Sequence, residues 1–478
     1  MKSYLSRLKN YIIPFLLLHV LIYSQAVKNG FDSQFNSIIS GSFFTTSIIG
    51  LEVYDLTDKK TIVSKNEKLL LRPASNMKVL TSGAALMYLP DDYKFATNFY
   101  FDGSKVDSTF YGSIFVEGGF DPEYTDKDLD TVVLVLKKLG IKSIQGKILA
   151  DISNTDSLYW GKGWMWDDNP SEFQPYITSL NINHNTVKIV CEPGKAGERA
   201  KVSVYPSSNY FTFDNSVKTI WGKNSDVDVT RDWINNSNKI VASGEISYKR
   251  RSDTTIINVL HPELYFITLL KEKLIQNDIK VIAELDTGTV TAASKLFLTQ
   301  TTPMPDVLNN MNAESENLNA ECFLRALAKE HFDPPYSAKK GLKMVDSLVW
   351  KLGYNPKNYV FADGCGLSFY NLVSAELITD MLKYFYAKQP EKYILLAGSF
   401  PLAGKNGTLE NRMKYGPAFN NVKAKTGTIS GVSSLSGYLT TKKNHILAFS
   451  ILIQNFRGNA TQPRNIQDKI CELLIENY

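Results

Sequence analysis

Residues 71–89 read LRPASNMKVLTSGAALMYL, and this stretch decides the fold prediction. Ser75 is followed three residues later by Lys78, which precedes an almost unbroken run of small and apolar residues. Residues three apart share one face of a helix, so a helix that begins at Ser75 places its hydroxyl beside the Lys78 amine. Amides at a helix start favour developing negative charge, and apolar surroundings lower the pKa of a lysine. The stretch therefore predicts a serine nucleophile activated by a neutral lysine.

An N-capping serine followed by a snorkelling lysine would give the same local pattern. Two later stretches favour the catalytic interpretation. MNAESENLNAE carries Ser315 and Asn317 ahead of a predicted helix, and VKAKTGTI opens a predicted strand with Lys425, Thr426 and Gly427. Ser-x-x-Lys, Ser-x-Asn and Lys-Thr-Gly in this chain order form the set of motifs used by penicillin-binding proteins and serine β-lactamases.

Over nearly its whole length after the N-terminal segment, the chain resembles the class C low-molecular-mass penicillin-binding proteins. These are D-alanyl-D-alanine carboxypeptidases that also act as endopeptidases. The stretches that carry the resemblance are RPASNMK (72–78), EGGFDPEY (117–124), GWMWDD (163–168), MNAESENLNAE (311–321), FADGCGLS (361–368), FPLAGKNGTLENR (400–412) and AKTGTISGVSSLSGYL (424–439). Two positions depart from the family pattern: Glu316 stands where aspartate is more frequent, and Cys365 stands where serine is usual.

The order of the predicted elements indicates one domain interrupted by an insertion. We expect an α/β fold, the penicillin-binding and serine β-lactamase-like transpeptidase domain, in which an antiparallel sheet is flanked by helices. This domain is predicted to comprise residues 27–92 plus 288–478. Strand-like alternation dominates the residues between, 93–287, which are predicted to form one or more mostly-β inserted domains with helices at 128–139 and 261–276. The long gap before Ser315 fits the insertion typical of the resembled family and exceeds the gap in a plain β-lactamase.

The N-terminal residues 1–26 have the pattern of a secretory signal peptide. Basic residues precede a short apolar run from Tyr11 to Tyr23, and the small-x-small sequence SQA ends at Ala26. An uncleaved anchor is the alternative interpretation. We therefore expect an exported protein, periplasmic or extracellular, with at most peripheral membrane association. The formal net charge is +5, and no basic run indicates nucleic-acid binding.

The four cysteines, Cys191, Cys322, Cys365 and Cys471, show no C-x-x-C spacing, and the sequence contains no H-E-x-x-H motif. A zinc site is therefore not indicated, and buried free thiols are the expected state. We expect neither a metal ion nor an organic cofactor.

The resemblance implies roles for the residues of the first two motifs. Ser75 attacks the carbonyl of the penultimate D-alanine and forms an acyl-enzyme. Neutral Lys78 takes the serine proton, and Ser315 relays a proton toward the departing D-alanine amine. Asn317 orients the substrate amide and the lysine.

The same resemblance implies substrate contacts along the third motif. Lys425 adds positive field near the substrate carboxylate, and Thr426 and Thr428 offer their hydroxyl groups to it. Backbone amides of Ser75 and Thr428 form the oxyanion hole. Gly427 is expected to let the substrate backbone lie close to the strand.

The GWMWDD stretch, within the predicted insertion, contributes Asp167 and Asp168. The resemblance implies that this part approaches the cleft and reads the charged end of the peptidoglycan stem peptide, although aromatic residues there could also belong to a core.

Together these observations predict a serine D-Ala-D-Ala carboxypeptidase that acts on peptidoglycan stem peptides and is covalently inhibited by β-lactams. Hydrolysis of D-alanyl cross-links as a D,D-endopeptidase stays open. One alternative is a β-lactamase or esterase on the same scaffold, which the long insertion and the lack of a dedicated deacylating glutamate disfavour. Another is a non-hydrolytic peptidoglycan-binding or β-lactam-sensing protein, which the three intact motifs disfavour.

Overall fold

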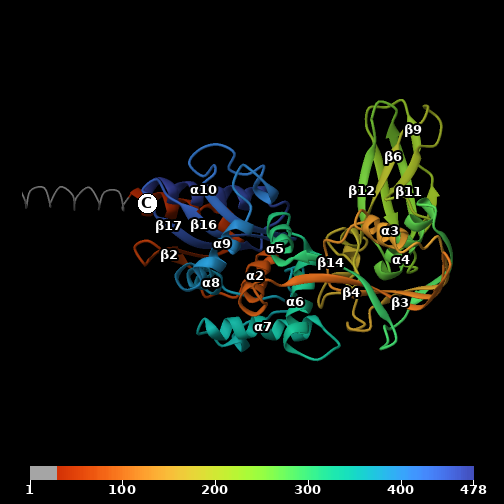
Figure 1. Ribbon diagram of the computed structural model, residues 1–478. Helices are drawn as coiled ribbons and strands as arrows, with labels where there is room; N and C mark the ends of the chain where they lie inside the picture. The colour runs from red at the N-terminus through yellow and green to blue at the C-terminus, as the bar shows by residue number, and fades with distance from the viewer. Residues whose placement is uncertain (1–29) are drawn as a thin grey trace, which may run out of the picture. The chain divides into compact units, whose positions relative to one another are not determined.

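The computed structural model describes residues 30–478 (Figure 1), so the predicted signal peptide lies outside the described residues. Within this range no helix is both long enough and apolar enough to cross a membrane. The internal contacts divide the chain into two compact units. The first unit comprises residues 30–76 together with Val373–Tyr478, and the second unit comprises Met77–Leu372.

The first unit is built on a five-stranded antiparallel sheet in the order β15-β16-β17-β1-β2. Its strands are β1 (Ile48–Asp55), β2 (Lys60–Lys65), β15 (Val422–Ile429), β16 (Val432–Thr440) and β17 (Ile446–Gln454). Because β1 pairs with β17, the two ends of the chain rejoin in one sheet, and the predicted antiparallel sheet is confirmed.

Helices cover both faces of this sheet. Leu435 and Leu439 of β16 pack into one core with Ile470 and Leu474 of α10. Tyr438, between them in sequence, points to the other face, where its hydroxyl donates to the carbonyl oxygen of Leu382 in α8. Figure 1 shows α10 and α8 on opposite sides of β16 and β17. The helical elements of this unit are the helical residues 30–39, η1 (Ser42–Thr45), η2 (Ala74–Asn76), α8 (Ala375–Lys388), α9 (Pro390–Ser399), η6 (Gly407–Leu409) and α10 (Thr461–Asn477).

The second unit contains three sheets. The largest is five-stranded and mixed, with the order β13-β5-β4-β3-β14, and smaller sheets of four and three strands accompany it. The strands are β3 (Lys94–Val106), β4 (Thr109–Gly119), β5 (Ser143–Asp151), β6 (Thr186–Glu192), β7 (Lys201–Tyr205), β8 (Thr212–Asn215), β9 (Lys218–Ile220), β10 (Asp226–Arg231), β11 (Lys239–Ser247), β12 (Asp253–Asn258), β13 (Lys280–Thr287) and β14 (Lys295–Pro303).

The helices of the second unit fall into two groups. Helices α3 and α4 share a hydrophobic core with the surrounding strands, as Leu136 and Phe266 illustrate. Helix α2 contacts α5, α6 and α7. The helical elements are α2 (Met77–Tyr88), α3 (Leu129–Lys138), η3 (Trp166–Asp168), η4 (Asn183–Asn185), α4 (Pro262–Gln276), α5 (Met304–Ala313), α6 (Asn317–His331), α7 (Ala338–Lys351) and η5 (Pro356–Asn358).

The division into units cuts the chain at other points than the predicted domain boundaries. The predicted catalytic domain, 27–92 with 288–478 around an insertion at 93–287, follows the change in sequence texture and stays a prediction. Strand β14 lies after the predicted end of the insertion, yet it pairs with β3 along Lys295–Pro303. The alternating sequence of β14 predicts a strand but does not show which sheet that strand joins.

Candidate active site

Ser75 lies in η2, the short 3₁₀ turn that leads directly into α2. Ala74, immediately before it, adopts a φ of 47°, a left-handed conformation that residues with a Cβ rarely adopt. The next side chain, Asn76, is completely buried and ties the turn to the sheet. Its amide nitrogen donates to the carbonyl oxygen of Lys425 (2.9 Å), and its oxygen accepts from the backbone N–H of Ser436 (3.1 Å). These bonds fix the serine turn beside the Lys-Thr-Gly strand.

Gly427 is required for that approach. A Cβ at this position would lie 2.2 Å from Ser434 Oγ, 2.8 Å from the backbone nitrogen of Ser75 and 2.9 Å from the carbonyl oxygen of Pro73. Ser434 Oγ itself donates to Pro73 O (2.6 Å). The sequence suggested a glycine for close approach of the substrate; the structure shows that the missing side chain makes room for the backbone of Ser75.

Strand β15, which carries the third motif, is at the edge of its sheet. Lys425 is completely buried, and its Nζ donates to the carbonyl oxygen of Thr426 (2.8 Å). The Thr426 hydroxyl donates to Thr408 Oγ1 (2.8 Å), while Thr428 is exposed and accepts from Arg464 Nη2 (3.1 Å). Sequence reasoning missed Arg464, because no motif surrounds it at the start of α10.

Lys78 belongs to the second unit, on the first turn of α2, and is completely buried. Its Nζ donates to Asn317 Oδ1 (2.6 Å) and to the carbonyl oxygen of Cys365 (2.8 Å). Burial lowers the pKa of Lys78, and the nearby acidic groups, including Cys365 and Asp363, oppose that shift in part. The burial of Lys78 that the apolar stretch led us to expect is confirmed, and its role as a base stays a prediction.

The segment that presents the Cys365 carbonyl to Lys78 is held by two buried carboxylates. Asp363 accepts from the backbone N–H groups of Gly366 (2.8 Å) and Ser368 (2.7 Å). Glu321 of α6 accepts from the backbone N–H groups of Gly364 (2.8 Å) and Cys365 (3.2 Å). Burial raises the pKa of Glu321. Sequence analysis did not single out either carboxylate, because a loop-anchoring role depends on contacts distant in sequence.

Cys365 is completely buried, and its thiol contacts Asp363 Oδ2 (3.5 Å). Burial raises the pKa of this thiol well above its ordinary value. Although Glu321, Asp363 and Cys365 lie close enough to share a metal ion, backbone N–H groups already use the carboxylate oxygens. The cluster therefore orders the loop.

Ser315 and Asn317 occupy the junction between α5 and α6. Ser315 adopts a φ of 68°, and Asn317 begins α6. Besides accepting from Lys78, Asn317 donates through Nδ2 to the carbonyl oxygen of Phe173. Glu316, between them, is partly buried, and its charge acts on Lys78. Burial raises the pKa of Glu316 itself. Glu316, which stands where the resembled family more often has aspartate, is thus close enough to influence the pKa of Lys78.

Asp167 and Asp168 lie on η3 and are both exposed. Partial burial and the neighbouring Asp167 raise the pKa of Asp168. The loop that carries them is anchored by Trp164, whose Nε1 donates to Asp363 Oδ2 (2.9 Å). Through this bond, the loop of the two aspartates is tied to the loop that contacts Lys78, in the same unit.

The structure therefore brings the predicted residues together in two groups. In the first unit, Ser75 lies against the strand of Lys425, Thr426 and Gly427. In the second unit, Lys78 is bonded to Asn317. Ser75 and Lys78 are three residues apart along one continuous helical segment, 74–88.

The antiparallel sheet flanked by helices, with a serine turn against a Lys-Thr-Gly strand, defines a serine hydrolase of the penicillin-binding and serine β-lactamase fold. Comparison with known proteins gives the particular family. The chain belongs to the D-Ala-D-Ala carboxypeptidase 3 (S13) family, whose model matches residues 33–477.

Individual relatives agree with this assignment. The chain is 28% identical to the D-alanyl-D-alanine carboxypeptidase DacB of Haemophilus influenzae, with 86% of each protein covered. It is also 28% identical to the D-alanyl-D-alanine carboxypeptidase of an Actinomadura species, over 92% of this chain and 84% of that one. The crystal structure of penicillin binding protein 4 from Haemophilus influenzae superimposes with a TM-score of 0.80 at 25% identity, covering 93% of this chain and 99% of that one. The chain is thus a serine-type D-Ala-D-Ala carboxypeptidase, as the sequence predicted.

Proposed function

We propose that Ser75 is the nucleophile and Lys78 its general base in hydrolysis of the D-Ala-D-Ala bond of peptidoglycan stem peptides. The observation that carries this proposal is the environment of Lys78. A completely buried amine that donates to the amide and carbonyl oxygens of Asn317 and Cys365, with a lowered pKa, is suited to lose its proton.

The reaction then proceeds in two steps. Ser75 Oγ attacks the carbonyl carbon of the penultimate D-alanine while its proton passes to Lys78 Nζ. The C–N bond breaks, Ser315 gives its proton to the departing D-alanine amine and takes one from Lys78 in return, and an ester to Ser75 remains. Water hydrolyses this ester and releases the shortened peptide. Backbone N–H groups of Ser75 and Thr428 stabilise the oxyanion.

Strand β15 would receive the substrate backbone as an added strand. Support comes from its position at the edge of the sheet, since an edge strand presents backbone groups to an extended peptide. The terminal carboxylate would meet the hydroxyls of Thr426 and Thr428 and the field of Lys425. Arg464, which donates to Thr428 Oγ1, would add a second positive charge there.

We also propose where the reaction takes place and on which substrates. The substrates would be stem peptides outside the cytoplasmic membrane, reached by export through the sequence at 1–26. A β-lactam would acylate Ser75 as a substrate does and remain bound. We propose cleavage of D-alanyl cross-links as a second activity of this site, because that reaction also begins with attack on the carbonyl carbon of a D-alanine.

The test is a Ser75→Ala variant beside the parent. The parent should release D-alanine from a stem pentapeptide, detected by mass, and should be labelled by a fluorescent penicillin. The variant should do neither, because no other nucleophile is proposed. Covalent labelling of the variant at parental stoichiometry would remove Ser75 from the mechanism. Rapid nitrocefin turnover by the parent without D-alanine release would instead favour the β-lactamase alternative.

A further inference from the structure

A second candidate site lies in the second unit, within residues 160–236. It is a cavity of about 520 Å³ lined by aromatic and amide side chains and one isoleucine, none of them charged. The lining residues are Trp160, Trp166, Asn169, Tyr176, Trp233, Ile234 and Asn236. Ligand sites of this kind combine apolar walls with a few placed polar groups.

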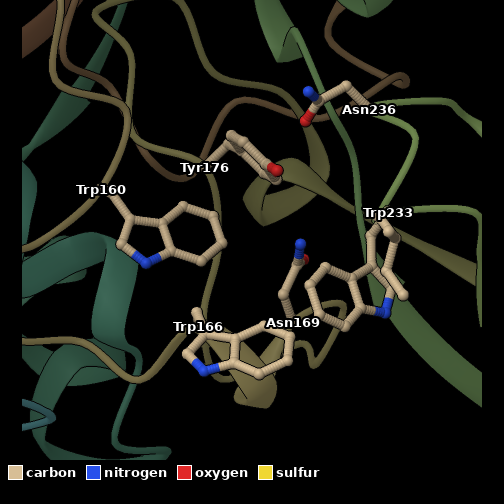
Figure 2. A pocket seen from close by; sticks show the side chains of 7 residues that line it. Trp160, Trp166, Asn169, Tyr176, Trp233 and Asn236 are labelled. Atoms are coloured by element: carbon tan, nitrogen blue, oxygen red, sulfur yellow. The ribbon is translucent and has the colours of Figure 1, made fainter.

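The aromatic rings form the walls of the cavity in two pairs. Trp166 and Trp233 lie with ring centroids 5.3 Å apart, and Trp160 and Tyr176 lie 4.8 Å apart. Trp166 is 68% exposed, which is unusual for a tryptophan that contributes to a core. Figure 2 shows the four rings around a common space. The space between the two pairs is therefore bounded by apolar ring surfaces that a ligand can contact.

Asn169 supplies the polar group at the centre. The side chain is 7% exposed, and its Oδ1 accepts from both Arg231 Nη2 (3.2 Å) and Asn258 Nδ2 (2.8 Å). With the oxygen committed to two donors, the amide can have only one orientation. Its Nδ2 has no hydrogen-bond partner within the part of the chain that the structure describes. Figure 2 shows this nitrogen turned into the space between the rings. A donor that faces the cavity and makes no bond within the protein can be met by an acceptor oxygen of a ligand.

The charge around the cavity selects the class of ligand. Arg231 is buried directly behind the wall, with its guanidinium 5.5 Å from the centre of the Tyr176 ring. Aromatic cages often bind amines. Asp167 and Asp168 follow Trp166 on η3, but they do not line the cavity. Inside it, the N–H groups of Asn169 and the charge of Arg231 would oppose a cation. The cavity instead suits an uncharged ligand with apolar faces and acceptor oxygens.

We propose that this cavity binds an N-acetylated hexosamine of a glycan strand. One face of a pyranose ring carries several C–H groups and can lie against an indole. The acetamido carbonyl would accept from Asn169 Nδ2, and its methyl group would meet the aromatic wall. The choice of an amino sugar rests on the proposed function, because the stem peptides of peptidoglycan hang from such a strand. The site would hold the strand while the catalytic residues process its peptide.

Binding is tested on the full-length protein with tetra-N-acetylchitotetraose, a neutral oligomer of N-acetylglucosamine, by titration calorimetry and tryptophan fluorescence. The parent should bind saturably, and cellotetraose, which lacks the acetamido groups, should bind at least about fivefold more weakly. Trp233→Ala should weaken binding roughly three- to tenfold. The matched control is Trp221→Ala, since Trp221 is 74% exposed and packs on Tyr248 outside the cavity. Its affinity should equal that of the parent.

A second variant distinguishes loss of the ligand contact from a general loss of folding in Trp233→Ala. Asn169→Asp keeps the two acceptor interactions with Arg231 and Asn258 but replaces the inward donor by an acceptor, and should weaken binding at least about tenfold. Melting temperature and the rate of benzylpenicillin acylation establish that each variant is folded. No saturable binding by the parent, or equal affinity of the parent, Trp233→Ala and Asn169→Asp, would overturn the proposal.

A kinetic arm separates this proposal from the proposed function. Trp233→Ala should raise the KM for pentapeptides still attached to a glycan strand and leave kcat/KM for the free pentapeptide unchanged. If free pentapeptide is cleaved but the sugar does not bind, the glycan site alone is wrong. If the sugar binds and no D-alanine is released from either substrate, the proposed catalysis fails and the glycan site stands.

Discussion

Each unit holds one completely buried lysine of the candidate active site, and the two are held differently. Lys78 lies on a helix in the second unit, donates to Asn317 and Cys365, and is within electrostatic reach of several carboxylates. Lys425 lies on the edge strand of the first unit and donates to the carbonyl oxygen of Thr426. The first arrangement suits an amine that must lose and regain a proton. The second suits a fixed charge beside hydroxyl groups that a ligand can reach.

The largest expected effect distinguishes the two lysines. Lys78→Arg should lower the rate of penicillin acylation by about 10³-fold or more, because a guanidinium with a pKa above ~12 cannot act as a base. Lys425→Arg keeps the positive charge that the role of Lys425 requires, and its rate of penicillin acylation should fall only roughly ten- to a hundredfold. Stopped-flow acylation of the two variants measures both. Equal losses would mean that the two lysines act alike, as electrostatic anchors.

The next effect tests the contact between the serine turn and the strand. Gly427→Ala places a methyl group within 2.8 Å of the Ser75 nitrogen, so the nucleophile must move. We expect acylation to slow by about 10²-fold, since catalysis depends on the position of the attacking atom. Gly398→Ala is the matched control, because a Cβ there meets no atom within 4 Å. Parental acylation by Gly427→Ala would show that the turn tolerates displacement.

A smaller effect concerns the exposed aspartates of the second unit. The double change Asp167→Asn with Asp168→Asn should leave penicillin acylation within a few-fold. It should reduce kcat/KM roughly fivefold for peptides whose third residue carries a free amine, because an exposed charge pair contributes about 1 kcal/mol. Acetylated peptides should show little difference between parent and variant. Equal losses on both peptides would assign these aspartates to the fold.

The smallest expected effect tests how a neighbouring carboxylate changes the pKa of Lys78. The folded pKa of this amine is lowered, so the neutral form that accepts the serine proton grows as pH rises through that value, and acylation rises with it. The Glu316 carboxylate raises the lysine pKa in part. Glu316→Gln should therefore move the acid limb of the pH profile to lower pH, by less than about one unit. Glu330→Gln, at the exposed far end of α6, the helix that begins directly after Glu316, should leave the profile unchanged. A shift to higher pH would contradict the proposed influence of Glu316.

Much of the fold was predictable because its signals are local. The helix expected to begin at Ser75 appears as η2 and α2, and the helices expected at 128–139 and 261–276 appear as α3 and α4. Buried Lys78 was predictable from its apolar neighbours in sequence. These features depend on periodicity and on residues close in the chain.

The unpredicted parts of the site depend on backbone atoms and on distant partners. The carbonyl oxygen of Cys365 contacts Lys78 regardless of its side chain, so the residue type carries no signal for it. Arg464 reaches Thr428 from a helix with no motif. The sequence could show that Gly427 lacks a side chain, but only the packing shows that Ser75 lies where the side chain would be.

The cysteines described above have a practical consequence for experiments and for export. All four are free and buried, so no cross-link contributes to the stability of this fold. Maturation therefore needs no oxidant, and a reducing medium leaves the covalent structure of the folded chain unchanged. Burial also keeps the thiols protonated and poorly reactive, as the raised pKa of Cys365 and Cys471 indicates. A single cysteine introduced on the surface would thus be the preferred target of a maleimide dye, and the position of a bound glycan could be followed from it.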